Sequence, residues 1–248
     1  MRHIIPVSGG KDSGALALWL HKNRPLLEGE YECVFTDTLS ELPETYEFLD
    51  RLGEALGKPV TRLVAAGGGL KDYIKKWGGF LPNGQARYCT RISKIKPFED
   101  YVGDEPCVVY IAFTADESER AGHLYSAKPT LRHEYPFIEA GIVDSMRVLC
   151  EFGVAPPSYY SWRSRSGCSF CFFQRKREWK GLLKRHPELF EEAEDLERDK
   201  EFKWRGKDKP LSRIRDEVEW EERQGTLFPS DEIERDDYSD EACTACSI

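Results

Sequence analysis

The stretch that decides the fold is residues 4–13, which read Ile-Ile-Pro-Val-Ser-Gly-Gly-Lys-Asp-Ser. A short apolar run leads into a turn of small residues, and an apolar helical pattern follows from Gly14. This order predicts a buried strand, a tight loop and a helix. Unpaired backbone N–H groups at the helix N-terminus then face one point, a geometry that suits a phosphate group.

The side chains of this loop add charge and hydrogen-bond donors. Lys11 supplies a positive charge, and Ser8 and Ser13 supply hydroxyl groups. The loop is not a Walker-type P-loop, because the pattern GxxxxGK[ST] is absent. An ordinary strand–helix turn is the alternative, so the other motifs of the chain decide between the two interpretations.

Length and composition predict one large domain with an appendage. The chain has 248 residues, of which 40% are hydrophobic, enough for a substantial core. It has no apolar run of about 18 residues and no signal-peptide pattern, so we expect a cytoplasmic protein without a membrane span. Its eight cysteines then point to metal binding, redox chemistry or burial rather than to structural disulfides.

Charge is unevenly distributed along the chain. The net charge of -8 argues against unaided, non-specific binding of nucleic acid. Residues 162–186 nevertheless hold eight basic side chains and one acid, Glu178, and we expect this segment to meet phosphate or sulfate. Residues 229–242 show the reverse pattern, with seven acids and Arg235, typical of a solvated tail.

The first half of the chain alternates strands and helices. Strands are predicted over residues 3–7, 31–36, 60–64 and 107–113, and helices over 13–22, 43–56, 70–77 and 92–101. This alternation predicts an α/β fold with a doubly wound, mostly parallel sheet. Ligands of such sheets bind beyond the carboxyl ends of the strands, where the loops 8–13, 37–38 and 114–120 are expected to converge.

The pattern changes after about residue 133. A helix is predicted near residues 143–152, Pro156 and Pro157 interrupt the chain, and residues 180–199 favour one charged amphipathic helix. We therefore predict three parts. They are a nucleotide-binding domain (1–134), a smaller helical and irregular region with cysteines and basic residues that completes the site (135–228), and an acidic tail with a terminal CxxC (229–248).

Three further motifs follow strands or open helices. Asp37 and Thr38 end the second strand, and a Pro-Glu-Thr helix start follows at residues 43–45. Residues 87–90 read Arg-Tyr-Cys-Thr, with Lys94 and Pro97 downstream. Residues 114–120 read Thr-Ala-Asp-Glu-Ser-Glu-Arg. Each motif has an ordinary structural alternative, such as a capped helix start with exposed charges.

Together with the first loop, these motifs resemble the phosphoadenylylsulfate (PAPS) reductase branch of the PP-loop ATP pyrophosphatases, which belong to the HUP-type nucleotide-binding folds. The resemblance implies ATP and Mg²⁺ as cofactors, with pyrophosphate released and an adenylylated product left. Two departures stand out, since Leu39 replaces a usual Gly and Thr114 replaces a usual Arg. The implied catalytic residues are Lys11, Asp12, Asp37 and Arg120. The implied nucleotide-binding residues are Ser8, Gly9, Gly10, Lys11, Asp12, Ser13, Asp37, Thr38, Lys94, Glu117 and Arg120.

A second cysteine motif lies at residues 167–171, Gly-Cys-Ser-Phe-Cys. A lone CxxC fits zinc, redox or iron–sulfur chemistry. The resemblance implies a [4Fe-4S] cluster with Cys89, Cys168 and Cys171 as ligands, and Cys243 or Cys246 as the fourth. Tyr88-Cys89 stands where cluster-bearing relatives have adjacent cysteines, so that ligand set is incomplete, and zinc is the alternative metal. The remaining cysteines, Cys33, Cys107 and Cys150, are interpreted as core residues.

Three functional hypotheses follow from the resemblance. The first is an ATP pyrophosphatase that adenylylates an acceptor for sulfur transfer, as in tRNA thiolation or DNA phosphorothioation. A sulfur donor such as a cysteine desulfurase would serve it, and a partner protein would hold the polymer against residues 163–185. The second is a PAPS or adenylylsulfate reductase, although the chain ends in Ala-Cys-Thr-Ala-Cys-Ser-Ile rather than the Glu-Cys-Gly-Leu-His of the reductases. The third is a non-catalytic nucleotide- or cluster-binding subunit. The oligomeric state stays open.

Overall fold

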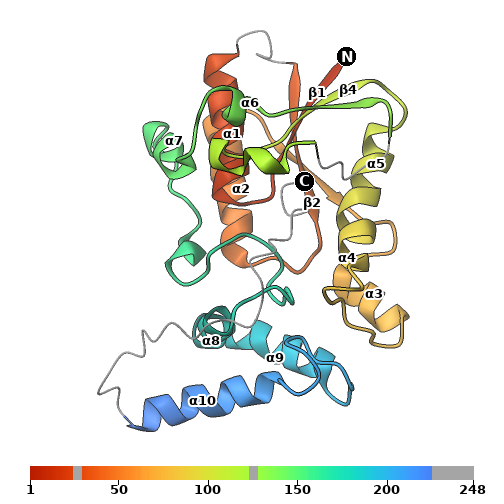
Figure 1. Ribbon diagram of the computed structural model, residues 1–248, viewed down its shortest axis with the longest axis vertical. Helices are drawn as coiled ribbons and strands as arrows, with labels where there is room; N and C mark the ends of the chain where they lie inside the picture. Colours follow the sequence, from red (N-terminus) through yellow and green to blue (C-terminus); the bar gives the residue numbers. More distant parts are fainter. Residues whose placement is uncertain (25–29, 123–127, 225–248) are drawn as a thin grey trace.

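A computed structural model describes residues 1–24, 30–122 and 128–224 of the chain. Its centre is a five-stranded sheet in the order β3-β2-β1-β4-β5, in which every neighbouring pair is parallel (Figure 1). This arrangement confirms the predicted α/β fold with a doubly wound parallel sheet. The strands are β1 (Arg2–Pro6), β2 (Tyr31–Asp37), β3 (Val60–Val64), β4 (Cys107–Tyr110) and β5 (Leu131–Glu134).

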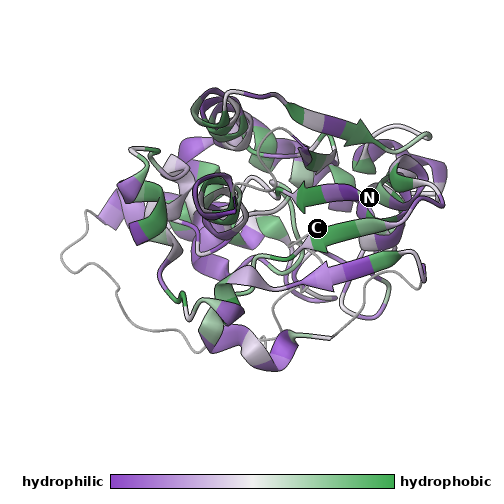
Figure 2. Ribbon diagram, turned by 90° about the horizontal axis from the view of Figure 1, so that it is seen from above, coloured by the Kyte–Doolittle hydropathy of each residue, from purple (hydrophilic) through white to green (hydrophobic). Residues whose placement is uncertain are grey.

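Helices cover both faces of the sheet. Ile4 and Ile5 of the central strand β1 are both fully buried, and they belong to different hydrophobic clusters because successive side chains point to opposite faces. Ile5 packs with residues of α1 (Lys11–Asn23), α2 (Pro43–Leu56) and α7 (Ser145–Glu151). Ile4 packs with Phe98 and Val102 of α5 (Lys96–Val102). Figure 2 shows strands with green, hydrophobic segments that lie between layers of helices.

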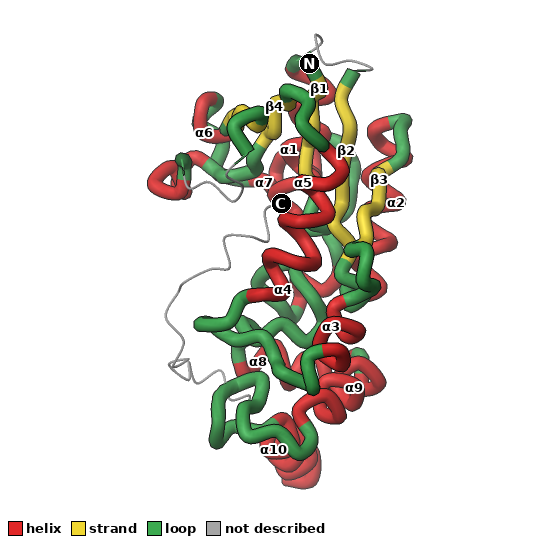
Figure 3. The backbone as a smooth tube through the Cα atoms, turned by 90° about the vertical axis from the view of Figure 1, so that its right-hand side faces the viewer, coloured by secondary structure: helices red, strands yellow, loops and turns green. Residues whose placement is uncertain are grey.

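A second hydrophobic cluster lies beyond the carboxyl end of β2. It joins α8 (Lys176–Arg185), α9 (Pro187–Glu197) and α10 (Leu211–Gln224) around the buried side chains of Trp179 and Phe190. Leu42, Ile74 and Leu81, from the first half of the chain, pack in the same cluster. Figure 3 shows α3 (Leu70–Lys76) and α4 (Tyr88–Thr90) between the sheet and these helices.

The prediction of one helix over residues 180–199 is wrong. The chain leaves α8 at His186, whose backbone is not helical (φ −137°, ψ 64°), and α9 begins at the next residue, Pro187. Proline has no N–H to continue the hydrogen-bond ladder, and it disfavours helical backbone in the residue before it. The helix α10 was not predicted, because its charged composition hides the three buried side chains Leu211, Ile214 and Val218.

The remaining helices and turns are short. The predicted helix over 92–101 is part of a longer helical span that runs from α4 through a π-helical turn (Arg91–Ile95) into α5. Two 3₁₀ turns, η3 (Ala115–Arg120) and η4 (Ser158–Ser161), and α6 (Pro136–Glu139) complete the elements. Cys33 and Cys107 are buried as expected, but Cys150 is exposed on α7, so its interpretation as a core residue is wrong.

Within the described residues, no helix combines the length and the apolar character needed to cross a bilayer. The predicted domain boundaries at residues 134/135 and 228/229 stay predictions. The second of these lies outside the described residues.

Candidate nucleotide-binding site

The loop between β1 and α1 is held by its own side chains. The Ser8 amide donates to Ser13 Oγ at 2.9 Å, and Ser13 Oγ donates to the Gly10 carbonyl at 3.3 Å. Gly9 has a left-handed backbone (φ +71°), and a Cβ there would lie 2.3 Å from Cγ2 of Thr45. A glycine is therefore required at this position, for backbone conformation and for space.

Residues from the second half of the chain close over this loop. The Tyr159 hydroxyl donates to the Gly9 carbonyl at 2.9 Å, and the Lys11 amide donates to the Tyr160 hydroxyl at 3.0 Å. Ser166 Oγ lies 3.4 Å from Ser8 Oγ. Burial raises the pKa of Tyr160 to about 12, so its hydroxyl stays protonated at neutral pH.

Sequence reasoning did not assign these three residues to the site. Two adjacent tyrosines just before the CxxC motif are the one sequence feature that could have indicated a role in the site. Aromatic residues in such a position more often belong to a hydrophobic core, however. The contacts join segments about 150 residues apart, as in the 149-residue separation between Lys11 and Tyr160, and only the folded topology reveals them.

The charged residues of the loop meet the first residue of α7. Lys11 Nζ lies 2.6 Å from Asp12 Oδ1 and donates to Ser145 Oγ at 3.2 Å. Ser145 Oγ also donates to Asp12 Oδ1. Ser145 is almost fully buried, whereas the side chains of Lys11 and Asp12 keep 31% and 38% of their exposure. Both charges are thus accessible to a ligand, while nothing in the sequence pointed to Ser145.

Asp37 and Thr38 lie at the neighbouring strand end. Asp37 is buried, and its Oδ1 accepts hydrogen bonds from the Leu39 amide at 2.7 Å and the Tyr46 hydroxyl at 2.9 Å. Leu39 occupies the left-handed region (φ +53°), at the position where the resembled family has glycine. This chain keeps the turn with a leucine, at a cost of roughly 1 kcal/mol or more.

The strand end after β2 contacts the CxxC segment directly. Thr38 Oγ1 donates to Glu41 Oε1 at 2.7 Å and lies 3.3 Å from Cys168 Sγ. The Ser169 amide donates to the Ser40 carbonyl at 2.7 Å. Burial raises the pKa of Cys168, and the nearby Glu41 carboxylate raises it further, while the Lys94 charge opposes both. Cys168 is therefore held as a thiol, and Lys94 is close enough to act on it.

The cysteines that the structure describes do not form a preassembled metal site. The Cys171 amide donates to the Cys168 carbonyl at 3.2 Å, and Cys89 packs against the cluster that contains Cys168. Across residues 1–24, 30–122 and 128–224, no three His, Cys, Asp or Glu side chains are gathered closely enough to hold a metal ion. Cys243 and Cys246 lie outside the described residues. Metal or cluster binding by Cys89, Cys168 and Cys171 therefore stays a prediction.

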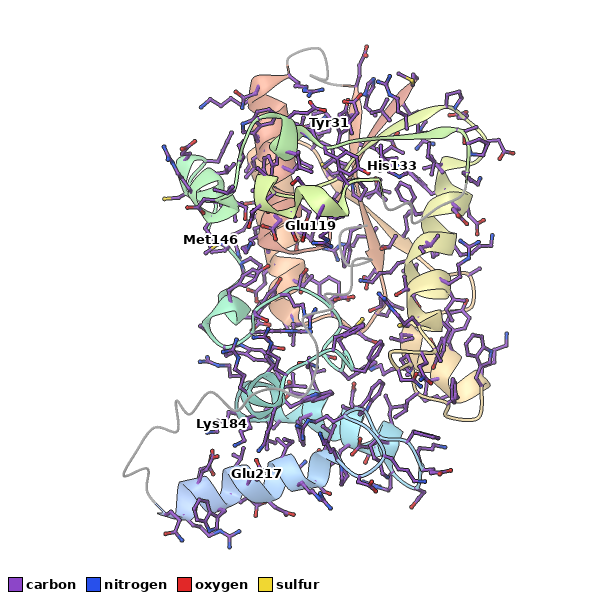
Figure 4. The ribbon with its side chains drawn as sticks, in the orientation of Figure 1. Tyr31, Glu119, His133, Met146, Lys184 and Glu217 are labelled. Atoms are coloured by element: carbon purple, nitrogen blue, oxygen red, sulfur yellow. The ribbon has the colours of Figure 1, made fainter. Side chains whose placement is uncertain are left out.

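Glu117 and Arg120 contact each other on η3. Glu117 Oε2 accepts from the Thr114 amide at 3.3 Å and from its hydroxyl at 3.2 Å. Arg120 forms an ion pair with Glu117 and lies over the Phe113 ring, 4.2 Å from its centroid. The Ala115 amide donates to the Ile142 carbonyl at 2.8 Å, which ties η3 to the chain just ahead of Ser145. Figure 4 labels Glu119 on this turn and Met146 on α7.

Comparisons with known proteins agree with this geometry. Residues 2–112 match the family model of the phosphoadenosine phosphosulfate reductase domain. Among solved structures, the phosphoadenylyl-sulfate (PAPS) reductase from Candida auris, in a phosphate complex, matches with a TM-score of 0.52 and 14% identity. The match covers 68% of this chain and 81% of that chain, and at this identity it shows the fold. No curated protein is a significant match. The resemblance found in the sequence is thus confirmed for residues 2–112, which are similar to the phosphoadenosine phosphosulfate reductase domain.

Proposed function

We propose that this protein is an ATP pyrophosphatase that adenylylates an acceptor for sulfur transfer. The observation that carries the proposal is the contact of Lys11, Asp12 and Ser145 at the N-terminus of α1, beside a turn that requires glycine. A positive charge, hydroxyl groups and the first N–H groups of a helix at one point are the groups that bind a polyphosphate.

In the reaction that we propose, an acceptor oxygen attacks the α-phosphorus of ATP. The bond from the α-phosphorus to the bridging oxygen breaks, and pyrophosphate leaves with that electron pair. Lys11 would neutralise charge on the leaving group, exchanging its contact with Asp12 for one with phosphate. The Lys11 amide, which now donates to Tyr160, would become available to a phosphate oxygen if Tyr160 moves aside.

Asp12 and Asp37 are the residues that would hold Mg²⁺. This ion is usually bound by one or two carboxylates together with water and substrate phosphates, so a cage built only from protein is not required. Asp12 fits this role because its carboxylate is partly exposed beside the loop. When bound, Mg²⁺ supplies charge neutralisation on the departing pyrophosphate.

The acceptor that we propose is a nucleic acid, and the sulfur comes from a donor such as a cysteine desulfurase. The net charge of -8 favours a partner protein that helps to hold the polymer. Iron–sulfur or zinc binding by Cys89, Cys168 and Cys171 with Cys243 or Cys246 stays a prediction. Iron, sulfide and zinc measured per chain after anaerobic purification, in the wild type and in Cys168→Ser, would test it.

A PAPS or adenylylsulfate reductase is the second candidate, favoured by the family model and the fold. In that reaction a cysteine thiolate attacks the sulfur of the sulfonate group, and the S–O bond to the nucleotide breaks. A reduced thiol partner then releases sulfite from the sulfur-bound intermediate. The nucleophile would have to be Cys243 or Cys246 or one of the described cysteines, and buried Cys168 is unsuited because its pKa is raised.

The test compares nucleotide products. We expect the wild type, with Mg²⁺ and [α-³²P]ATP, to release pyrophosphate and to label tRNA or DNA. Lys11→Ala should lower this rate roughly 10²- to 10³-fold, because a charge that stabilises the transition state is lost. Lys22→Ala, at the far end of α1, is the matched control and should react like the wild type. Release of ADP instead of AMP products would contradict the proposal, and sulfite release from PAPS would favour the second candidate.

A further inference from the structure

Three aromatic side chains form a partly exposed group between the sheet and the helical region. This aromatic face consists of Trp77, Phe80 and Tyr88. The rings of Trp77 and Tyr88 have centroids 4.4 Å apart at 63°, and those of Phe80 and Tyr88 are stacked at 6.0 Å and 28°. The Tyr88 hydroxyl donates to the Phe80 carbonyl, which fixes the group. Trp77 and Phe80 nevertheless remain 43% and 47% exposed.

The chain around the aromatic face is strongly basic. Residues 73–98 contain six basic side chains and no acidic one, in a protein whose net charge is -8. Lys75 and Lys76 are exposed on α3, next in sequence to Trp77, and no described carboxylate forms an ion pair with either of them. The six basic residues are Lys75, Lys76, Arg87, Arg91, Lys94 and Lys96.

The aromatic face adjoins the hydrophobic cluster that also supports the candidate nucleotide site. Its supporting side chains, Ile74 and Leu81, are buried in the same cluster as Tyr159 and Cys168. Tyr159 in turn donates to the Gly9 carbonyl of the nucleotide loop. Tyr88 is followed directly by Cys89, which packs against that cluster. The aromatic face and the nucleotide loop are thus linked through one hydrophobic cluster.

We propose that the aromatic face, with Lys75 and Lys76, binds a single-stranded segment of nucleic acid. Exposed rings match bases, and lysines that pair with no described carboxylate match phosphates, because bases stack on aromatic side chains and the backbone is drawn to positive charge. A duplex hides the faces of its bases, so the rings favour a single strand. The inference deepens the proposed function by naming the acceptor class, but binding itself needs no ATP.

The experiment measures binding of fluorescein-labelled dT12 and U12 by anisotropy, without nucleotide, at several salt concentrations. We expect Trp77→Ala to weaken binding about 5- to 100-fold, the range for loss of one stacked base. Lys75→Gln with Lys76→Gln should reduce the slope of log K against log salt by about 1.4, the value for two phosphate contacts on a single strand. Trp77→Phe keeps an aromatic ring and should retain most of the affinity.

Trp220→Ala is the matched control, since Trp220 is 63% exposed but lies among Glu219, Glu221 and Glu222 on α10. It should leave binding unchanged. Equal effects of the two tryptophan variants, an unchanged affinity in Trp77→Ala, or equal binding of a duplex would overturn the proposal. Lys11→Ala separates the two proposals, because it should lower turnover roughly 10²- to 10³-fold and leave oligonucleotide binding intact. Binding without turnover in the wild type would therefore count against the proposed function alone.

Discussion

Residues 163–185 hold eight basic side chains and residues 73–98 hold six, yet the fold uses the two stretches differently. In the first, lysines of α8 face acidic residues of α10, as Figure 4 shows for the neighbourhood of Lys184 and Glu217. Lys176 lies 3.0 Å from Glu217, and Lys180 lies 2.6 Å from Glu221. In the second, Lys75 and Lys76 meet no such carboxylate among the described residues. A basic run in the sequence is therefore not by itself an open basic surface.

The arginines of residues 163–185 also serve the fold. Arg163 is buried and donates to the Cys168 carbonyl at 2.8 Å, and Arg165 donates to the Phe173 carbonyl at 2.8 Å. The sequence prediction that this segment contacts a polymer stays a prediction. Several of its basic side chains have internal partners, and so do Arg91 and Lys96 of the second stretch, which pair with Glu99 and Asp100. The contrast therefore lies in Lys75 and Lys76, on which our proposal of such a contact rests.

The largest expected effect tests the internal role of residues 163–185. Glu178 is fully buried, and its carboxylate accepts from the Ser164 amide and hydroxyl and from the Arg175 amide at 2.6–3.0 Å. Glu178→Ala leaves these donors and the buried charge of Arg163 uncompensated, so we expect a loss of roughly 3–5 kcal/mol in the free energy of unfolding. Urea denaturation measures it, and exposed Glu222→Ala is the control. A loss below about 1 kcal/mol would contradict the internal, structural role that distinguishes residues 163–185 from residues 73–98.

The same carboxylate predicts a pH dependence. Burial works to raise the pKa of Glu178, but the hydrogen bonds from Ser164 and Arg175 and the charge of Arg163 outweigh it and hold the pKa below its ordinary value of 4.5. Because its pKa is lowered in the folded state, the ionised Glu178 carboxylate contributes its full share to the free energy of unfolding above pH 4.5. That contribution is lost as the pH falls through the pKa of the folded state. The stability difference between wild type and Glu178→Gln should therefore shrink in acid. A difference that grows in acid would contradict the assignment.

A smaller effect concerns the pairing of α8 with α10. Glu217→Gln with Glu221→Gln removes the carboxylates that face Lys176, Lys180 and Lys184. Freed lysines should bind dT12 more tightly, by about 3- to 10-fold at low salt, because each can then contact a phosphate. Fluorescence anisotropy measures the change in affinity. The control is the double variant Glu219→Gln/Glu222→Gln, which removes the same number of negative charges from α10. An unchanged affinity would mean that α10 does not mask these lysines.

The smallest expected effect concerns the free energy of unfolding after loss of one lysine from each stretch, Lys180 or Lys76. Lys180 is 21% exposed and lies near both Glu217 and Glu221, so Lys180→Gln should cost about 0.5–1 kcal/mol. Lys76→Gln removes a side chain that forms no ion pair with any residue the structure describes, and it should change the free energy of unfolding by less than about 0.5 kcal/mol. Parallel urea titrations check both values. Equal costs would show that Lys76 has a structural partner as well.

Much of the sheet could be predicted from the sequence, because β1, β2 and β3 are apolar runs punctuated by loops and helices. The strand β5 was missed, since its four residues Leu-Arg-His-Glu include one buried side chain and give no apolar pattern. Pro187 is the sequence signal for the break between α8 and α9. The charged pattern continues on both sides of this proline and favours one helix, which is why the prediction is wrong there.

The candidate site was predictable only where it is local in sequence. The loop at residues 8–13 contains its own signal in its glycines, lysine and serines. Ser145, Tyr159 and Tyr160 reach that loop through the topology, and their residue types occur widely in packed interiors. Arg120 was placed in the site by resemblance, whereas the structure pairs it with Glu117 beside Phe113.

The hydrogen bonds from Tyr159 and Tyr160 to the nucleotide loop have a thermodynamic consequence. A ligand that accepts the hydrogen bond of the Lys11 amide in place of Tyr160 would weaken the packing of residues 158–171 on the nucleotide loop. By reciprocity, that packing lowers the affinity for the ligand by the same factor. A ligand that leaves the amide in place and fills the loop would instead tighten the packing. The rate of amide hydrogen exchange at residues 158–171 would therefore distinguish the two cases. It should rise when a nucleotide binds the Lys11 amide and fall when the nucleotide leaves that amide with Tyr160.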